Sequence, residues 1–322
     1  MMGTGPFAEP TFRRLHETHH QIVALVTSPL RPKHGKAKKA AAVNGMRDLA
    51  HQYGIEVFDP QDINLPQSLE RLASYEAGLM IVCDYGQILS AEALGTARLG
   101  GINLHGSLLP KYRGAAPINW AIYHGETHTG VTVIHMTPRV DAGPCIGQAT
   151  TPIESEENAA EVEARLCEVG GWLTRRTVDL LEADQSESLP QDASLASKAP
   201  RLKKSDGAID WSRTSIQIKN HIRAMEPWPK CFTFWHHSGQ HRPKDQPARL
   251  IMGPLLVLDE PEIPIDAPPG RVLEAEADRL VIKTGDGAVL LGQVQPAGKR
   301  AMNIDEFLRG YHVAVGEQFG PL

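Results

Sequence analysis

The chain has 322 residues, of which 41% are hydrophobic and 22% charged, and its formal net charge is −5. This length and composition are ordinary for a globular protein with a sizeable core and suggest about two domains. The negative charge gives no overall support for a nucleic-acid partner. No apolar run approaches the roughly 20 residues that cross a bilayer, and the N-terminus lacks the order of a signal peptide. We therefore expect a cytoplasmic protein with no membrane partner.

The cysteines lie far apart and form no C-x-x-C pair. Such scattered cysteines are typical of a reducing compartment, and they argue against a disulfide framework or a zinc site. The residues are Cys83, Cys145, Cys167 and Cys231.

Strand and helix patterns alternate in the first half of the chain. Apolar runs of strand length occupy residues 21–28, 56–59 and 78–83. Helical spacing predicts helices over 40–53 and 66–76, and a longer amphipathic helix over 157–183. Uninterrupted strands that alternate with helices predict an α/β domain, built on a doubly wound, mostly parallel sheet with helices on both faces.

The pattern changes after residue 183. Residues 184–204 are polar, poor in helix signals and basic towards their end, which indicates a linker. Beyond it we expect a helix over 215–225 and a hairpin over 279–294 that turns at 284–287. The predicted organisation is a domain over 1–183, a basic linker over 184–204, and a small β-rich, barrel-like domain over 205–322.

Two motifs near the N-terminus are interpreted as structural. The run His16-Glu17-Thr18-His19-His20 fits H-E-x-x-H, but the chain passes directly into a strand and no further ligand follows. We expect helix-end histidines that face solvent. The run Gly3-Thr4-Gly5 with Ala8 resembles a dinucleotide fingerprint, but the acidic ribose partner about 20 residues further on is missing. We interpret it as a tight turn between a strand and a helix.

The first strand is expected to be short. A strand of such a sheet needs about five residues, yet only Met1 and Met2 precede the glycine turn. We expect the native start to lie several codons upstream.

Residues 102–122, with the sequence INLHGSLLPKYRGAAPINWAI, are the most informative segment. Asn103 and His105 lie two positions apart on an expected short strand, so their side chains project from the same face. A helix is predicted to begin at Pro117, a position that favours proline. A satisfied, half-buried His and Asn beside a turn is the alternative interpretation.

Asp141 is the third candidate, in a loop that follows a predicted strand within 130–147. If that strand runs parallel beside the Asn103 strand, the loop reaches the sheet edge at which α/β proteins bind ligands. The three groups suit acyl transfer: Asn103 donates to the oxyanion, His105 is an acid, base or charged donor, and Asp141 orients it. No Ser or Cys lies in a recognisable elbow, which favours direct transfer to an amine. From the residues alone, Asp141 could equally cap its own loop.

Two local clusters of basic residues stand out. Residues 31–39 hold five Lys/Arg and no acid, and the second cluster comprises Lys198, Arg201, Lys203 and Lys204. Such clusters can neutralise phosphates even on an acidic protein, although each could also be a solvated loop.

Taken together, these segments resemble the folate-dependent formyltransferases, and most closely the members that act on methionyl-tRNA. The resemblance covers nearly the whole chain. It is carried by NLHGSLLP at 103–110, RGAAP at 113–117 and DAG at 141–143, by MGTGPFAEPTF at 2–12 and the basic loop at 27–39, and by KKSDGAIDW at 203–211, IRAMEPWP at 222–229 and QPAGKRAMNIDEFLRGYHVAVGEQF at 295–319.

The resemblance implies a function and a set of residues. The enzyme would transfer the formyl group of 10-formyltetrahydrofolate to the amino group of methionine on initiator tRNA, as a monomer and without a metal. Asn103, His105 and Asp141 would be the catalytic trio, and an OB-like C-terminal domain would contact tRNA. The implied folate-binding residues are Ser107, Leu108, Leu109, Pro110, Tyr85, Gly86, Gln87, Ile88 and Val140. The implied tRNA-binding residues are Arg31, Lys33, Lys36, Lys38, Lys39, Lys203, Lys204, Lys299 and Arg300.

The chain departs from the family in its short first strand and at two further points. Asp84 precedes Tyr85-Gly86 where the family usually has Ala, and its acid could perturb the folate pocket or point outward. From residue 205 onward there are 13 Lys/Arg against 15 Asp/Glu, so any tRNA contact depends on how the charges are distributed.

Three alternatives remain open. They are a sister formyltransferase that acts on a sugar-nucleotide amine, a formyltetrahydrofolate hydrolase, and a non-catalytic RNA-binding protein with the same fold. The basic loop and the DEFLRG segment near the C-terminus argue against the first two, and the intact trio argues against the third.

Overall fold

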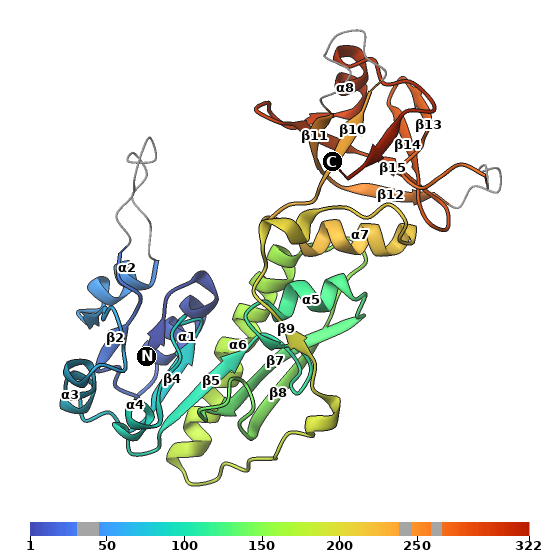
Figure 1. The fold of residues 1–322 in the computed structure, drawn as a ribbon. Coiled ribbons are helices and arrows are strands. Elements are labelled where there is room, and N and C mark those ends of the chain that lie inside the picture. The colour runs from blue at the N-terminus through green and yellow to red at the C-terminus, as the bar shows by residue number, and fades with distance from the viewer. Residues whose placement is uncertain (31–44, 238–246, 259–265, 322) are drawn as a thin grey trace. The chain divides into compact units, whose positions relative to one another are not determined.

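The structure is a computed structural model that describes residues 1–30, 45–237, 247–258 and 266–321. Its contacts divide the chain into two compact units, whose elements are labelled in Figure 1. The first unit comprises residues 1–117, 128–152 and 161–200, and the second comprises residues 118–127, 153–160 and 201–322. No helix within the described ranges is both long enough and apolar enough to cross a membrane.

The first unit is built on a seven-stranded sheet in the order β3-β2-β1-β4-β5-β7-β8. The five strands from β3 to β5 pair in parallel, whereas β7 is antiparallel to both β5 and β8. The expectation of a mostly parallel sheet is therefore confirmed. The strands are β1 (Met2–Gly3), β2 (Ala24–Val26), β3 (Glu56–Phe58), β4 (Met80–Cys83), β5 (Gly101–His105), β7 (His128–His135) and β8 (Cys145–Pro152).

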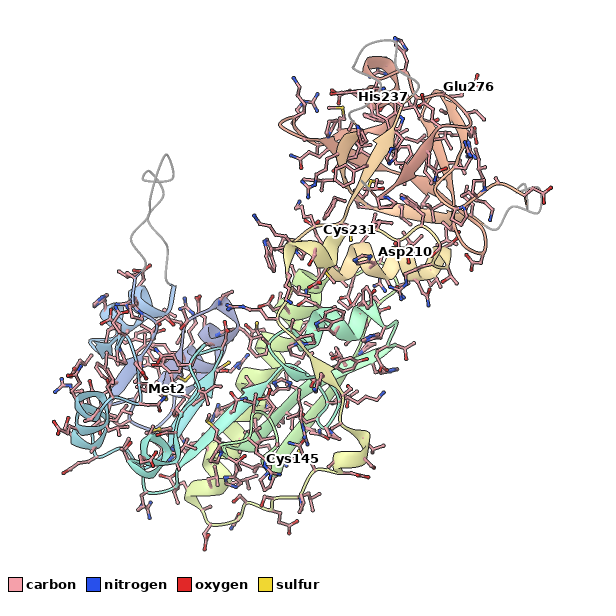
Figure 2. The ribbon with its side chains drawn as sticks, in the orientation of Figure 1. Met2, Cys145, Asp210, Cys231, His237 and Glu276 are labelled. Carbon is pink, nitrogen blue, oxygen red and sulfur yellow. The ribbon has the colours of Figure 1, made fainter. Side chains whose placement is uncertain are left out.

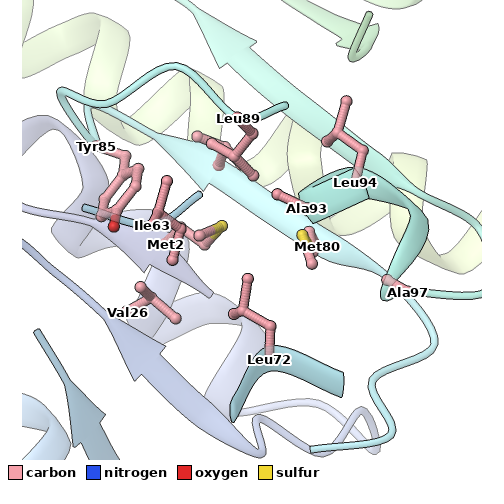
Figure 3. Close-up of a cluster of buried hydrophobic side chains, with 11 residues drawn as sticks. Met2, Val26, Ile63, Leu72, Met80, Tyr85, Leu89, Ala93, Leu94 and Ala97 are labelled. Carbon is pink, nitrogen blue, oxygen red and sulfur yellow. The ribbon is translucent and has the colours of Figure 1, made fainter. Parts of the chain in front are cut away.

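Helices cover both faces of this sheet. On one face, α3 and α4 close a buried apolar cluster that includes Met2, Val26 and Met80 of the strands (Figure 3). On the other face, Gly170 of α6 lies directly against Leu104 of β5. The two-sided burial explains why the strands read as uninterrupted apolar runs. The helices are η1 (Pro6–Ala8), α1 (Glu9–His16), α2 (Gly45–Gln52), α3 (Pro66–Ser74), α4 (Ala91–Gly95) and α6 (Ala159–Glu182).

Local chemistry explains where several helices begin. Pro66 opens α3 and Pro117 opens α5 (Pro117–Tyr123), since proline lacks an N–H that the first turn would leave unpaired. The side chain of Ser90 caps α4 by accepting from the N–H of Ala93. The predicted strand over 21–28 is shorter than expected, and residues 40–44 of the predicted helix over 40–53 lie outside the described residues.

The second unit contains two antiparallel sheets, in the orders β17-β16-β11-β10-β18 and β12-β15-β14-β13. The predicted hairpin is confirmed, since β14 pairs with β15 across residues 284–287. A bridge between Arg271 and Gln318 joins the two sheets, so the β-rich unit is barrel-like. The strands are β10 (Phe232–His236), β11 (Ala248–Met252), β12 (Leu255–Leu258), β13 (Val272–Glu276), β14 (Arg279–Lys283), β15 (Ala288–Leu291), β16 (Gln293–Pro296), β17 (Met302–Asn303) and β18 (Gln318–Gly320), and α8 is Ile304–Gly310.

Two short pieces from the first half of the chain belong to the second unit because they bind to α7 (Ser215–Ala224). Asn119 donates from Nδ2 to the carbonyl oxygen of Ala224 at 2.7 Å. Arg223 donates to the carbonyl oxygens of Glu154 and Glu157 at 2.9 and 2.7 Å. A capping box between Thr214 and its third neighbour starts α7, close to the predicted position.

His221 is a buried titratable group on α7. Its ring lies edge-on to Tyr123, and Nε2 donates to the carbonyl oxygen of Asp206 at 2.6 Å. Burial, the largest effect, lowers the pKa of His221 below its usual value. Below a pH of about 6.5 the unfolded chain therefore binds a proton more readily than the folded chain, and the stability falls as the pH falls.

We predict that His221→Gln removes part of this pH dependence. The difference in unfolding free energy between wild type and variant should change between about pH 8 and about pH 5, with the wild type losing more stability on acidification. Urea midpoints at several pH values measure this difference. His51→Gln, at an exposed position of α2, is the control, and equal pH slopes for wild type and His221→Gln would contradict the assignment.

Candidate active site

β5 carries two polar side chains on one face. These are Asn103 and His105, which alternate with the apolar side chains of Ile102 and Leu104. Leu104 points to α6. The register places Asn103 beside Val82, whose side chain belongs to the cluster beneath α3 and α4. Asn103 and His105 therefore share the face opposite to α6, as their spacing predicts.

Asp141 reaches this face by a different route from the one expected. The strand before its loop, β7, is antiparallel to β5 rather than parallel, so the prediction of a parallel neighbour is wrong. Between β5 and β7 the chain forms β6 (Arg113–Gly114) and α5, and it then runs back beside β5 as β7. A parallel strand would have required a crossover to the opposite edge. The loop over 136–144 folds back towards β5 and still brings Asp141 to Asn103 and His105.

Three distances define the trio. The Asp141 carboxylate accepts from Nδ2 of Asn103 at 3.4 Å and lies 3.6 Å from Nδ1 of His105. Nε2 of His105 lies 2.9 Å from the carbonyl oxygen of Tyr112. The side chains of His105 and Asp141 are only 5% and 11% exposed. Because a carbonyl oxygen can only accept, Nε2 of His105 is the donor in the contact with Tyr112.

The backbone beside the trio adopts unusual conformations. Asp141 has φ 52° and Tyr112 has φ 62°, in the left-handed region that costs about 1 kcal/mol or more for residues with a side chain. Gly114 has φ 128°, and a Cβ atom there would collide with the carbonyl oxygen of Ala199. The N–H of Gly114 donates to the Asp141 carboxylate at 2.9 Å. Strain of this kind is concentrated at functional sites.

The implied folate segment 107–110 is held to β7 through one hydroxyl. Oγ1 of Thr132 donates to the carbonyl oxygen of Ser107 at 2.7 Å and accepts from the N–H of Leu109 at 3.1 Å. Thr132 and Ser107 are fully buried. Gln148 donates from Nε2 to the carbonyl oxygen of Leu109 at 2.7 Å. The segment is therefore ordered by polar contacts that water cannot replace.

We predict that Thr132→Val destabilises the protein although it barely changes the volume. The N–H of Leu109 and the carbonyl of Ser107 would lose a buried partner, which should lower the free energy of unfolding by about 2 kcal/mol. Thr132→Ser keeps the hydroxyl and is the matched control, with a loss of about 1 kcal/mol for its missing methyl group. Urea unfolding compares the two variants, and equal losses would show that the hydroxyl does not order the segment.

The other residues implied to bind folate lie in the loop after β4 and in the Asp141 loop. Gln87 accepts from the N–H of Ile63 at 2.9 Å and so ties its loop to the segment between β3 and α3. Ile88 and Val140 are apolar side chains that are 66% and 54% exposed. The Tyr85 ring lies within the buried cluster of Figure 3, where burial raises the pKa of its hydroxyl. These placements leave the folate contacts a prediction.

Asp84 lies beside Gly5 rather than over the trio. A Cβ atom at Gly5 would collide with its carboxylate. Burial is the main cause that raises the pKa of Glu163 on α6, and the negative charge of Asp84 raises that pKa further. This helix covers the face opposite to Asn103 and His105, so the substitution at position 84 acts away from the trio.

The implied tRNA-binding residues are only partly described. Arg31, Lys33, Lys36, Lys38 and Lys39 lie outside the described residues. Four further basic side chains are exposed in the second unit, and Arg300 among them forms an ion pair with Glu306. They are Lys203, Lys204, Lys299 and Arg300.

The histidine motif is divided by the end of a helix. α1 ends at His16, whose ring stacks on Tyr53 at 3.7 Å. His19 faces solvent, as expected, but His20 does not, because it pairs with Asp179 of α6 at 2.8 Å and its side chain is 15% exposed. His19, His20 and Glu182 lie close enough to hold a metal ion. This group is separate from the trio.

Several residues around the trio were not predicted from sequence. They are Tyr112 through its carbonyl, Gly114, Thr132, and Gln191 from the expected linker. Only Gly114 carried a local signal, as the glycine of the RGAAP segment. The other three act through backbone groups or across long sequence distances, which a pattern of neighbours does not reveal.

The fold and the trio together define an α/β enzyme equipped for acyl transfer. An amide donor, an imidazole and a carboxylate converge on a shielded face, and donors so placed stabilise a tetrahedral oxyanion. Comparison with known families agrees with this class. The family described as formyl transferase matches residues 1–178, and the C-terminal domain of formyl transferase matches residues 201–312.

The chain belongs to the formyl transferase family, and within it to the methionyl-tRNA formyltransferases. It is 42% identical to the methionyl-tRNA formyltransferase of Rhodopirellula baltica, over 99% of this chain and 95% of that protein. It is 38% identical to that of Desulfotalea psychrophila, over 96% of this chain and 91% of that protein. The fold is also similar to an N-formyltransferase from Helicobacter canadensis, with a TM-score of 0.64, 17% identity, and coverage of 92% of this chain and 97% of that one.

Proposed function

We propose that this enzyme transfers the formyl group of 10-formyltetrahydrofolate to the α-amine of methionine on initiator tRNA. The observation that carries the proposal is the convergence of Asn103, His105 and Asp141 in a chain whose full-length relatives are named methionyl-tRNA formyltransferases. The proposal includes a monomeric enzyme that acts in the cytoplasm without a metal.

The trio supports a direct displacement. The amine nitrogen attacks the formyl carbon, a C–N bond forms, and the carbonyl π electrons move onto oxygen. Asn103 Nδ2 donates to this oxyanion, the Nε2–H of His105 turns from the Tyr112 carbonyl to become a second donor, and Asp141 faces the ring from the other side. When the intermediate collapses, the bond to the folate nitrogen breaks. A proton leaves the amine and reaches that nitrogen with the help of Asp141.

The hydrogen bonding of Ser107 supports direct transfer rather than an acyl-enzyme. Ser107 lies close to the trio, but its Oγ donates to the carbonyl oxygen of Lys111 at 2.7 Å and the residue is fully buried. An activated serine needs a base within hydrogen-bond reach. Within the described residues, His105 instead contacts Tyr112 and Asp141.

The donor would bind where the β4 and β5 strands end. These parallel neighbours place the Tyr85–Ile88 loop and the 107–110 segment at one edge of the sheet, the usual ligand-binding edge of α/β folds. The exposed apolar side chains of Ile88 and Val140 could cover an aromatic pterin ring. The acceptor tRNA would use the basic sequence at 31–39 and the four exposed cations of the second unit.

We predict that Asn103→Ala and His105→Ala each lower kcat for formyl transfer by about 100-fold or more, because each removes a donor to the oxyanion. Asp141→Ala should lower it by a similar factor, while all three variants keep their affinity for tRNA. Labelled formyl transfer and filter binding measure the two quantities. His51→Ala, far from the trio on α2, is the control. Near-normal turnover in any trio variant would refute the role given to that residue.

We predict that trypsin cuts the chain between Lys33 and Lys39 and that initiator tRNA protects it. Basic residues of a phosphate-binding loop become covered when the counterions are displaced. Cleavage followed by mass spectrometry, with and without tRNA, checks this prediction at low and at high salt. Cleavage that is unchanged at saturating tRNA would show that residues 33–39 do not contact the tRNA.

A further inference from the structure

We propose that residues 189–199 form a strap that positions the catalytic groups, with Gln191 and Ser197 as positioning residues. The inference rests on the proposed function, since it concerns the same trio. The strap belongs to the segment expected to be only a linker, yet every contact described below lies within the first unit.

The strap is fastened at both ends. Leu189 exchanges two backbone hydrogen bonds of 2.8 Å with Cys145, which is labelled in Figure 2 at the start of β8. At the other end, β9 (Lys198–Ala199) pairs in parallel with β6 (Arg113–Gly114). The residues between these two anchors pass beside the loop of Asp141.

The side-chain amide of Gln191 links the loop of Asp141 to Arg113 of β6. Nε2 donates to the carbonyl oxygens of Asp141 at 2.9 Å and of Gly143 at 2.7 Å. Oε1 accepts two hydrogen bonds from the Arg113 guanidinium, at 3.1 and 2.6 Å. Arg113 is followed by Gly114, whose N–H holds the Asp141 carboxylate. Gln191 therefore ties the backbone of Asp141 to the segment that fixes its side chain.

Ser197 acts in the same way on His105. Its Oγ accepts from the N–H of Tyr112 at 2.9 Å, and its carbonyl oxygen accepts from the N–H of Arg113 at 2.9 Å. The carbonyl of Tyr112 is the partner of Nε2 of His105. Gln191 thus acts on Asp141, and Ser197 acts on His105 through Tyr112. The Asp141 carboxylate and the His105 ring face each other across 3.6 Å.

The strained backbone of Asp141 and Tyr112 needs contacts that hold it in place, and the strap supplies them. Asp141 and Tyr112 both have positive φ angles, and such conformations persist only where surrounding contacts over-determine them. Without the two donors of Gln191, the Asp141 loop is free to relax towards more favourable angles. A carboxylate displaced by about 1 Å would no longer face the ring, and misplacement on that scale costs up to about 100-fold in rate.

The test is Gln191→Glu, which keeps the size of the side chain and an acceptor for Arg113 but removes both N–H donors. We expect kcat for formyl transfer to initiator Met-tRNA to fall about 10- to 100-fold, with the KM values for tRNA and folate nearly unchanged. Gln185→Glu, at an exposed position before the strap, is the matched control and should keep wild-type kcat. Gln191→Ala is a second variant, and tRNA affinity reports whether each variant folds.

Double variants separate positioning from a general structural effect. In the Asp141→Ala background, Gln191→Glu should cause no further loss, because it acts through Asp141. Ser197→Ala should be coupled to His105→Ala in the same manner. Normal kcat in Gln191→Glu, or a loss of kcat that adds to the loss in Asp141→Ala, would overturn the positioning role of Gln191. Full turnover in Asp141→Ala alone would instead overturn the catalytic assignment, so the two failures are distinguishable.

Discussion

The Asp141 carboxylate is held by segments that lie far apart in the sequence, and the rest of the site depends on this. Gly114 donates to it from β6, Asn103 approaches it from β5, and Gln191 fixes its backbone from the strap. The residue itself has a positive φ angle, so its own conformational preference does not place it there. Tertiary contacts therefore place the Asp141 carboxylate beside His105.

The mixed sheet brings the loop of Asp141 back to β5. β7 is antiparallel to both β5 and β8, so the chain runs back beside β5 before it enters the loop of Asp141. The loop between β7 and β8 then folds back over β5, and the strap covers it. The His105 and Asp141 side chains are therefore shielded from water, and donors in such surroundings interact with a charge more strongly than they do in water.

The sequence allowed the fold class to be predicted because its signals are local. Uninterrupted apolar runs, helical spacing and Pro117 as a helix start all depend on neighbouring residues. The pair Asn103 and His105 was found for the same reason, since strand periodicity places both on one face. The strand direction of β7 and the contacts of Gln191 and Thr132 depend instead on residues more than 20 positions away. A single sequence carries no direct signal for such pairings, and the resemblance to a known family located the trio without showing what holds it.

The central claim is that this site formylates methionine on initiator tRNA. The most direct measurement is single-turnover transfer from labelled 10-formyltetrahydrofolate by the full chain, with initiator Met-tRNA, elongator Met-tRNA, a sugar-nucleotide amine and water as competing acceptors. The account predicts that the label appears on initiator Met-tRNA at a rate well above that for each other acceptor. Faster transfer to the sugar-nucleotide amine, or release as formate, would contradict it.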